Sequence, residues 1–247
     1  MVAAVLGGCT TPPTGGTQSG PRPSSLAPAS VQPAIQPSAR STLPPTVHPP
    51  TQTPTQTATQ PLAIGPLIIP GLDLRAGPVA VPLELHIPSI GVSGPMVGVG
   101  ITPQNLMDAP RGPIDDPLWQ AAFWYRGSGI PGDSGTATIA GHVDDPLGRP
   151  AIFARLHELR PGDLIVVNDT RSGLDLRFLV TQNEIYTLQQ SADRAVLAQI
   201  YGAGPVAGQG PQPAPDGLAH LTLITCTGYI VNGSFDHHVV VYATRSP

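Results

Sequence analysis

Short runs of alternating apolar and polar residues recur along the C-terminal part of the chain, and Gly, Pro or Asp residues bound most of them. Such runs predict half-buried β-strands. The predicted strands are Leu83–Ile90, Met96–Ile101, Ala137–His142, Leu164–Asn168, Leu176–Leu188, Ala219–Thr227 and His237–Thr244. Many short strands with little helix favour a barrel or a sandwich.

Helical signals are few. Ser191 is predicted to cap a helix whose first turn holds Asp193, and Gly202 is predicted to end that helix. Residues 151–159 are expected to form irregular turns. Residues 202–217 are rich in Gly and Pro and show no periodicity, so we expect a loop there.

The N-terminal segment has a different composition. Residues 1–72 hold 15 of the 32 prolines, only two charged residues and no aromatic residue. Such a segment cannot bury enough apolar surface to offset its ordering entropy, so we expect it to be disordered. The predicted organisation is a linker over residues 1–75 and one folded domain over residues 76–247.

Charge and size exclude several function classes. The predicted domain contains nine Arg against fifteen Asp and Glu, which is not the basic footprint of a nucleic-acid-binding protein. The chain has no lysine, which excludes a lysine base or Schiff base. No segment reaches the roughly 18 apolar residues that a membrane-spanning helix needs.

Two predicted strands end in reactive side chains. The apolar run from Leu221 closes with Cys226, and the run from Thr136 closes with His142. A rigid scaffold presents side chains to solvent at strand ends. Cysteine and histidine are the parts of a thiol nucleophile and its acid/base partner. The alternatives are a small buried cysteine and a structural turn histidine.

The other cysteine, Cys9, lies in the linker, and nothing in the sequence positions it against Cys226, so we expect no disulfide between them. The stretch Leu6-Gly7-Gly8-Cys9 resembles a lipobox, the lipidation signal of bacterial lipoproteins. It lacks a basic region and a long apolar region before it. Either the match is chance, or an upstream segment is missing from the sequence. Membrane attachment would therefore depend on a lipid or on such a segment.

Five sequence motifs resemble those of the sortases, the cysteine transpeptidases of Gram-positive cell surfaces, and they occur along the chain in the same order as in that family. They are Thr222-Leu223-Ile224-Thr225-Cys226, Ala140-Gly141-His142, Ile87-Pro88-Ser89-Ile90-Gly91-Val92, Phe153-Ala154-Arg155-Leu156 with Leu159-Arg160-Pro161-Gly162-Asp163, and Val239-Val240-Val241-Tyr242-Ala243. The sequences around His142 and in the closing strand are most similar to those of the class E/F sortases.

The resemblance implies a closed β-barrel of about eight strands and an exported, membrane-anchored enzyme. Cys226 would cleave a Leu-Pro-x-Thr-Gly-like sorting signal of a secreted protein through a thioester. His142 would protonate the leaving amine. A cell-wall peptide amine would then accept the protein.

One position departs from the sortase pattern. Family members usually carry an arginine just before the closing strand, and the matching residue here is His238. Either His238 holds the oxyanion in its place, or Arg126 or Arg149 reaches in, or the site is weakened. The alternative is that His238 lies on a solvated edge or is a harmless replacement. The competing functions are a thiol hydrolase that trims surface proteins and an inactive sortase-like binding module.

No cofactor is expected. His157 and His220 show no zinc-ligand spacing with each other or with Cys226. The acidic pairs Asp115-Asp116 and Asp144-Asp145 could hold calcium, but adjacent carboxylates in such loops are more often solvated. The aromatic residues Trp119, Phe123, Trp124 and Tyr125 are expected to pack before the histidine strand, with Trp124 as a candidate groove residue.

Overall fold

The computed structural model describes residues 73–246. The lipobox-like stretch and most of the predicted linker lie outside the described residues. The strands are β1 (Val79–Ile87), β2 (Val92–Val99), β3 (Ala122–Tyr125), β4 (Gly135–Ala140), β5 (Leu164–Asp169), β6 (Leu174–Thr187), β7 (Ala219–Val231) and β8 (Ser234–Arg245).

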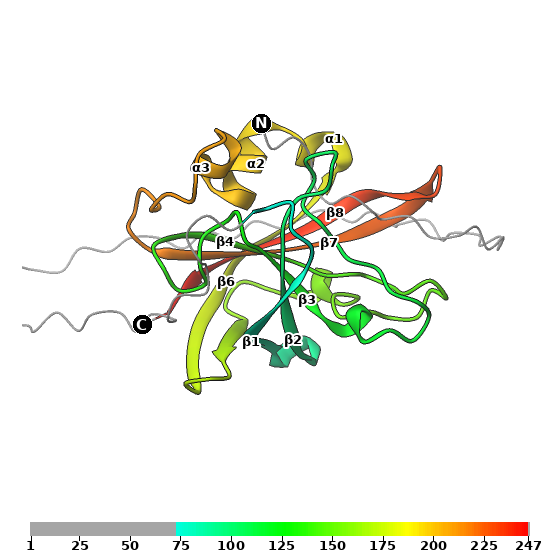
Figure 1. The fold of residues 1–247 in the computed structure, drawn as a ribbon, viewed down its shortest axis with the longest axis horizontal. Coiled ribbons are helices and arrows are strands. Elements are labelled where there is room, and N and C mark those ends of the chain that lie inside the picture. The colour runs from blue at the N-terminus through cyan, green and yellow to red at the C-terminus, as the bar shows by residue number, and fades with distance from the viewer. Residues whose placement is uncertain (1–72, 247) are drawn as a thin grey trace, which may run out of the picture. The chain divides into compact units, whose positions relative to one another are not determined.

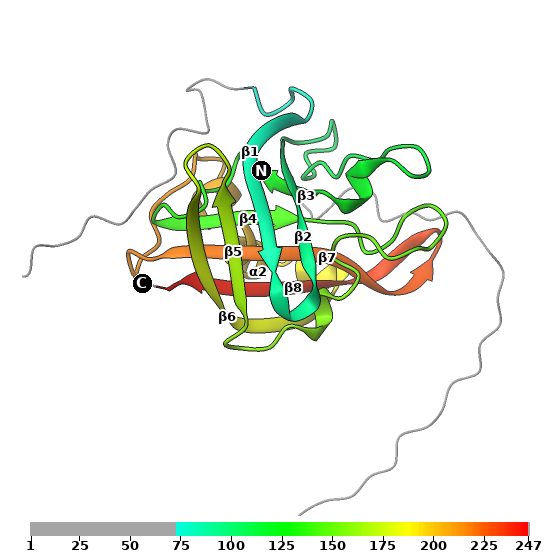
Figure 2. The same ribbon diagram turned by 90° about the horizontal axis from the view of Figure 1, so that it is seen from below.

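These strands form a closed barrel in the order β1-β2-β3-β4-β7-β8-β6-β5, and β5 pairs with β1 to close it (Figures 1 and 2). The β2–β3 and β4–β7 pairs are parallel, and the other pairs are antiparallel. The expected fold, a mainly β barrel of about eight strands, is therefore confirmed.

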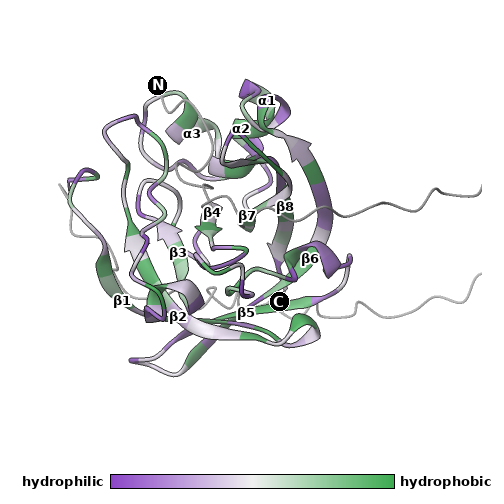
Figure 3. Cartoon of the chain, turned by 90° about the vertical axis from the view of Figure 1, so that its right-hand side faces the viewer, coloured by the Kyte–Doolittle hydropathy of each residue, from purple (hydrophilic) through white to green (hydrophobic). Residues whose placement is uncertain are grey.

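Hydrophobic and hydrophilic positions alternate along several strands (Figure 3), and the buried apolar residues fall into two clusters. On β7, Leu221 and Leu223 belong to the main core of the barrel. Ile224 and Cys226 point to the opposite face, into a second apolar cluster that also holds Leu197 and Ile200. Successive side chains of a strand point to opposite faces, so the odd-numbered residues face inward and the even-numbered ones outward.

The connection from β6 to β7 supplies the helices α1 (Leu188–Ser191), α2 (Arg194–Tyr201) and α3 (Ala203–Val206). All three lie on one side of the barrel (Figure 1): α1 packs against β6 and β8, α2 against β4, and α3 against α2. The hydroxyl of Thr138 on β4 donates a 2.6 Å hydrogen bond to the carbonyl oxygen of Ile200, at the end of α2. The outer apolar layer is therefore enclosed between sheet and helix.

The predicted helix start was wrong in detail. Thr187 caps α1 through a reciprocal pair of hydrogen bonds with Gln190, and Ser191 is the last residue of that helix. Asp193 caps α2, which ends before Gly202 as predicted. Ser191, which ends α1, and Asp193, which caps α2, are separated only by Ala192. The stretch expected to be a loop also contains α3.

Strand β3 was not predicted as a strand. Its four residues are all buried and do not alternate in polarity. The 3₁₀ turns Pro88–Ile90 and Pro117–Gln120 were also missed, whereas the irregular turn expected within residues 151–159 is present as Leu156–Glu158. No helix among residues 73–246 is long and apolar enough to span a bilayer.

Candidate active site

Strands β4 and β7 are parallel neighbours, and His142 and Cys226 lie at the same end of this pair. Ala140 is paired with Ile224 in their register. Beyond that pair, the Gly141 amide donates to the Ile224 carbonyl at 3.1 Å, and the Thr225 hydroxyl donates to the Gly141 carbonyl at 2.8 Å. His142 and Cys226 follow directly, so the two predicted site residues lie at the same edge of neighbouring strands.

Gly141 leaves room for the side chain of Phe153 at the end of β4. A Cβ atom at this position would lie 2.5 Å from the ring of Phe153, which packs against the strand end. Phe153 in turn donates its backbone N–H to the carbonyl of His142. In the Ala-Gly-His sequence, the glycine is therefore required for packing against Phe153, and the histidine is the candidate for the chemistry.

Cys226 differs from its expected placement in two ways. It lies within β7, which continues to Val231 as a hairpin with β8, so it does not end the strand. The buried part of β7 does end there, because the residues after Cys226 are progressively exposed. The side chain is 6% exposed. Its sulfur is in a disulfide bond, contrary to the expected thiol. Attack on a carbonyl therefore requires reduction first. Cys9, which was expected not to pair with it, lies outside the described residues.

The ring of His142 is held between aromatic side chains. Its centroid lies 4.7 Å from that of Trp119 and 5.3 Å from that of Phe123. Its Nε2 lies 2.9 Å from the carbonyl oxygen of Pro110. A carbonyl can only accept, so Nε2 carries a hydrogen, and in the neutral ring Nδ1 has the lone pair. This lone pair is the position at which the ring can take a thiol proton.

The electrostatic surroundings of His142 favour the neutral ring. Burial lowers the pKa of His142, and the nearby positive charge of Arg111 lowers it further, while the bond to Pro110 opposes both. A thiolate at Cys226 would act in the other direction, because a nearby negative charge stabilises the imidazolium.

His238 lies directly opposite Cys226 in the antiparallel β7–β8 register. Opposed residues of such a pair share one face of the sheet, with Cβ atoms about 4.5–5.5 Å apart. His238 is 2% exposed, and its Nδ1 lies 3.0 Å from the hydroxyl of Ser191. Burial, with a smaller contribution from the charge of His237, lowers its pKa to about 4. The solvated-edge interpretation of His238 is therefore wrong.

The arginines proposed to reach the site are engaged elsewhere. Arg126 donates to the backbone carbonyl of Ala76 at 2.6 Å, and Arg149 pairs with Asp115 and Asp145. The arginine that acts on His142 is Arg111, which sequence analysis did not select. It directly follows Pro110 in a loop without any periodic pattern, so no signal in the sequence connected it with His142.

The predictions for the aromatic and acidic residues are only partly confirmed. Trp119 and Phe123 contact His142, but Trp124 is fully buried in the main core and donates to the Gly129 carbonyl, so it does not line a groove. Asp116 caps the Pro117–Gln120 turn. No cluster of metal-ligating side chains occurs within residues 73–246, and the expectation that the acidic pairs are solvated and hold no calcium stays untested.

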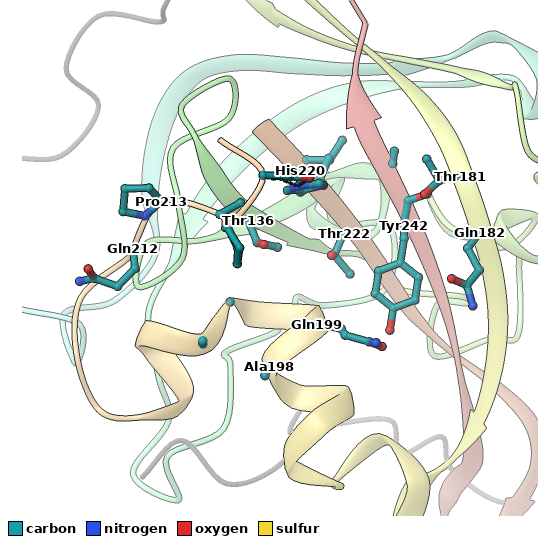
Figure 4. Close-up of a pocket in the computed structure, with 17 residues that line it drawn as sticks. Thr136, Thr181, Gln182, Ala198, Gln199, Gln212, Pro213, His220, Thr222 and Tyr242 are labelled. Atoms are coloured by element: carbon teal, nitrogen blue, oxygen red, sulfur yellow. Dashed lines mark hydrogen bonds and ion pairs between the residues drawn. The ribbon is translucent and has the colours of Figure 1, made fainter. Parts of the chain in front are cut away.

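A cavity of about 610 Å³ lies on the outer face of the sheet, toward the start of β7 (Figure 4). Tyr242, Gln199 and Gln182 point into it, and His220, held by Asp216 at 3.0 Å, lines its rim. None of the predicted site residues lines it. Helix α2, which packs on Ile224 and Val240, occupies the sheet between this cavity and Cys226.

The chain matches the sortase domain family over residues 85–246. None of the curated proteins matches it. Among solved structures it is similar to sortase C-1 from Actinomyces oris, at 22% identity and a TM-score of 0.43, covering 67% of this chain and 71% of that one. It is also similar to sortase A from Corynebacterium diphtheriae, at 21% identity and a TM-score of 0.45, covering 70% and 63%. The family match spans more than half of the chain, and the chain therefore belongs to the sortase family.

Proposed function

We propose that this protein is a cysteine transpeptidase that cleaves a Leu-Pro-x-Thr-Gly-like sorting signal and joins the protein to a cell-wall amine. Membership of the sortase family supports a transpeptidase role in general. The observation that carries the assignment is the Thr225–Gly141 hydrogen bond, which ties together the strand segments that hold Cys226 and His142.

In the first half-reaction, the reduced Cys226 loses its proton to His142. The thiolate attacks the threonine carbonyl of the signal, a C–S bond forms, and the carbonyl electrons move to oxygen. When the intermediate collapses, the C–N bond breaks, and the leaving amine takes the proton from His142. The products are a thioester and a free C-terminal fragment.

In the second half-reaction, an unprotonated amine attacks the thioester carbon. The C–S bond breaks, the sulfur leaves as thiolate, and the surplus proton of the new amide goes to a base. His238 is the third residue of the proposed site because it faces Cys226 across the β7–β8 pair. It was expected to hold the oxyanion in place of the arginine.

The setting of this activity is also proposed. Sortases act on the cell surface and are usually membrane-anchored. We place the domain outside the cytoplasm, attached through an upstream segment or, in the reduced protein, through lipidation of Cys9. A class E/F subtype remains part of the proposal. Its partners would be secreted proteins with sorting signals and a peptide amine of the wall.

Product analysis tests this function. The reduced domain is incubated with a Leu-Pro-x-Thr-Gly peptide, with and without triglycine, and Cys226→Ala is the control. An amide product supports transfer. Free acid in the presence of saturating triglycine would support the thiol hydrolase instead. Intact peptide after hours with folded, reduced protein would support the inactive binding module, which the lack of an arginine opposite Cys226 favours.

A further inference from the structure

The hydrogen-bond partners of His238 define which of its nitrogens carries a proton. The hydroxyl of Ser191 lies 3.0 Å from Nδ1 of His238 and 3.0 Å from the carbonyl oxygen of Leu188. A hydroxyl has one hydrogen to donate, and a carbonyl can only accept. Ser191 therefore donates to Leu188 and accepts from Nδ1–H of His238.

This arrangement leaves Nε2 of the neutral His238 ring with a lone pair and no hydrogen. A nitrogen in this state accepts a hydrogen bond or a proton and cannot donate one. A group that holds an oxyanion must donate. The contact with Ser191 thus conflicts with the oxyanion role expected for His238.

The residues around His238 reinforce the neutral state. It is buried, it faces Cys226 on one side and Tyr186 of β6 on the other, and α1 covers it through Ser191. The charged groups next to it on its own strand are Asp236 and His237, which hydrogen-bond to each other at 2.7 Å; Arg245 lies at the far end of that strand. Burial lowers the pKa of His238, and a positive charge on His237 acts in the same direction.

We propose that His238 is the general base of the second half-reaction, and that Ser191 is the positioning residue that keeps its Nε2 free of hydrogen. This inference rests on the proposed function and deepens it. At the position that faces the nucleophile, the family's arginine donates hydrogen bonds. In this protein His238 would instead accept a proton there.

The nitrogen of a neutral primary amine attacks the thioester carbon and gains a positive charge as the C–N bond forms. Nε2 of His238 takes one proton from that nitrogen, the C–S bond breaks, and Cys226 leaves as thiolate. His238 then releases its proton to solvent, because its lowered pKa makes the imidazolium a stronger acid than usual.

The test separates the two half-reactions by rapid quench of the reduced protein. Release of the C-terminal peptide fragment reports thioester formation, and appearance of the triglycine amide reports transfer. For His238→Asn, which retains an N–H toward Ser191 but has no Nε2, we expect transfer to fall by about 100-fold, within the range of general-base effects. Fragment release should slow far less, so the thioester should accumulate on Cys226.

His238→Arg distinguishes a base from an oxyanion donor. Arginine donates several hydrogen bonds but does not take up a proton at neutral pH. We expect transfer in His238→Arg to be as slow as in His238→Asn. Recovery of wild-type transfer in His238→Arg would overturn the proposal, and so would an equal slowing of both half-reactions in His238→Asn or unchanged transfer in that variant.

The role of Ser191 is tested by Ser191→Ala and Ser191→Thr. We expect Ser191→Ala to slow transfer several-fold and to change its pH profile, with fragment release nearly maintained, and Ser191→Thr to restore transfer because it keeps the hydroxyl. Loss of both half-reactions together would indicate a merely structural serine. If the wild-type protein formed no thioester, the proposed function itself would be contradicted. Fragment release measures this outcome separately from transfer.

Discussion

The hydroxyl of Thr225 donates a 2.8 Å hydrogen bond to the carbonyl oxygen of Gly141, across the parallel pair β4 and β7. Each of these residues directly precedes a proposed catalytic residue, Cys226 and His142. Both groups of the bond are buried, so the bond fixes the relative position of the two strand segments that the chemistry requires.

Thr225→Val removes this bond and keeps the side-chain shape. A buried carbonyl without its donor costs about 1–3 kcal/mol of folding free energy. We also expect turnover to fall by more than tenfold, because small displacements between reacting groups are costly. Thr138→Val is the matched control, since Thr138 likewise donates to a buried carbonyl but ties α2 to β4. Equal activity in the two variants, at similar stability in urea, would contradict this account.

The sequence predicted seven of the eight strands and both residues of the proposed nucleophile pair. It missed β3 because Ala122–Tyr125 is short and uniformly apolar, so its polarity has no period. It missed Arg111 because this residue lies in an irregular loop, and only folding brings its charge near His142. Cys226 looked like a strand end because the buried part of β7 ends there, although the backbone pairing continues to Val231.

Arg111→Gln is expected to raise the pKa of His142. The positive charge of Arg111 lowers this pKa, so its removal favours the imidazolium. The acidic limb of the rate of Cys226 alkylation in the reduced protein should therefore move to higher pH. Arg149→Gln serves as the control, because Arg149 pairs with Asp115 and Asp145 and does not contribute to the shift of His142. A downward movement in Arg111→Gln would show that the sign is wrong.

Trp119→Ala opens one face of the His142 ring to water. Burial is the main cause of the lowered pKa of His142, so this pKa should rise toward its ordinary value. Because the ring also loses its orientation, we expect fragment release to slow by at least tenfold. Trp119→Phe keeps an aromatic face and should retain most of the rate. Equal rates in both variants would mean that the ring contact does not orient His142.

His238 makes stability depend on pH. Its pKa falls from 6.5 in the unfolded chain to about 4 in the folded one, so the unfolded state binds more protons between these values. Stability is therefore full above pH about 6.5 and declines as the pH falls toward 4, by an amount on the order of 3 kcal/mol. Urea unfolding at pH 7 and pH 4.5 measures the decline.

His238→Gln provides the comparison for that decline. The variant cannot protonate in this range, so the difference in unfolding free energy between the two pH values should shrink relative to the wild type. Both proteins should be compared with Cys226 in the same oxidation state. An identical pH dependence would place the titrating group elsewhere.

The most direct measurement of the central claim is the intact mass of the protein during turnover. The reduced wild-type domain is mixed with a Leu-Pro-x-Thr-Gly peptide and quenched in acid within the first turnover. The account predicts a mass increase equal to the peptide's N-terminal part, located on Cys226, absent from Cys226→Ala and lost on addition of triglycine. A folded, reduced protein that never gains this mass would contradict the account.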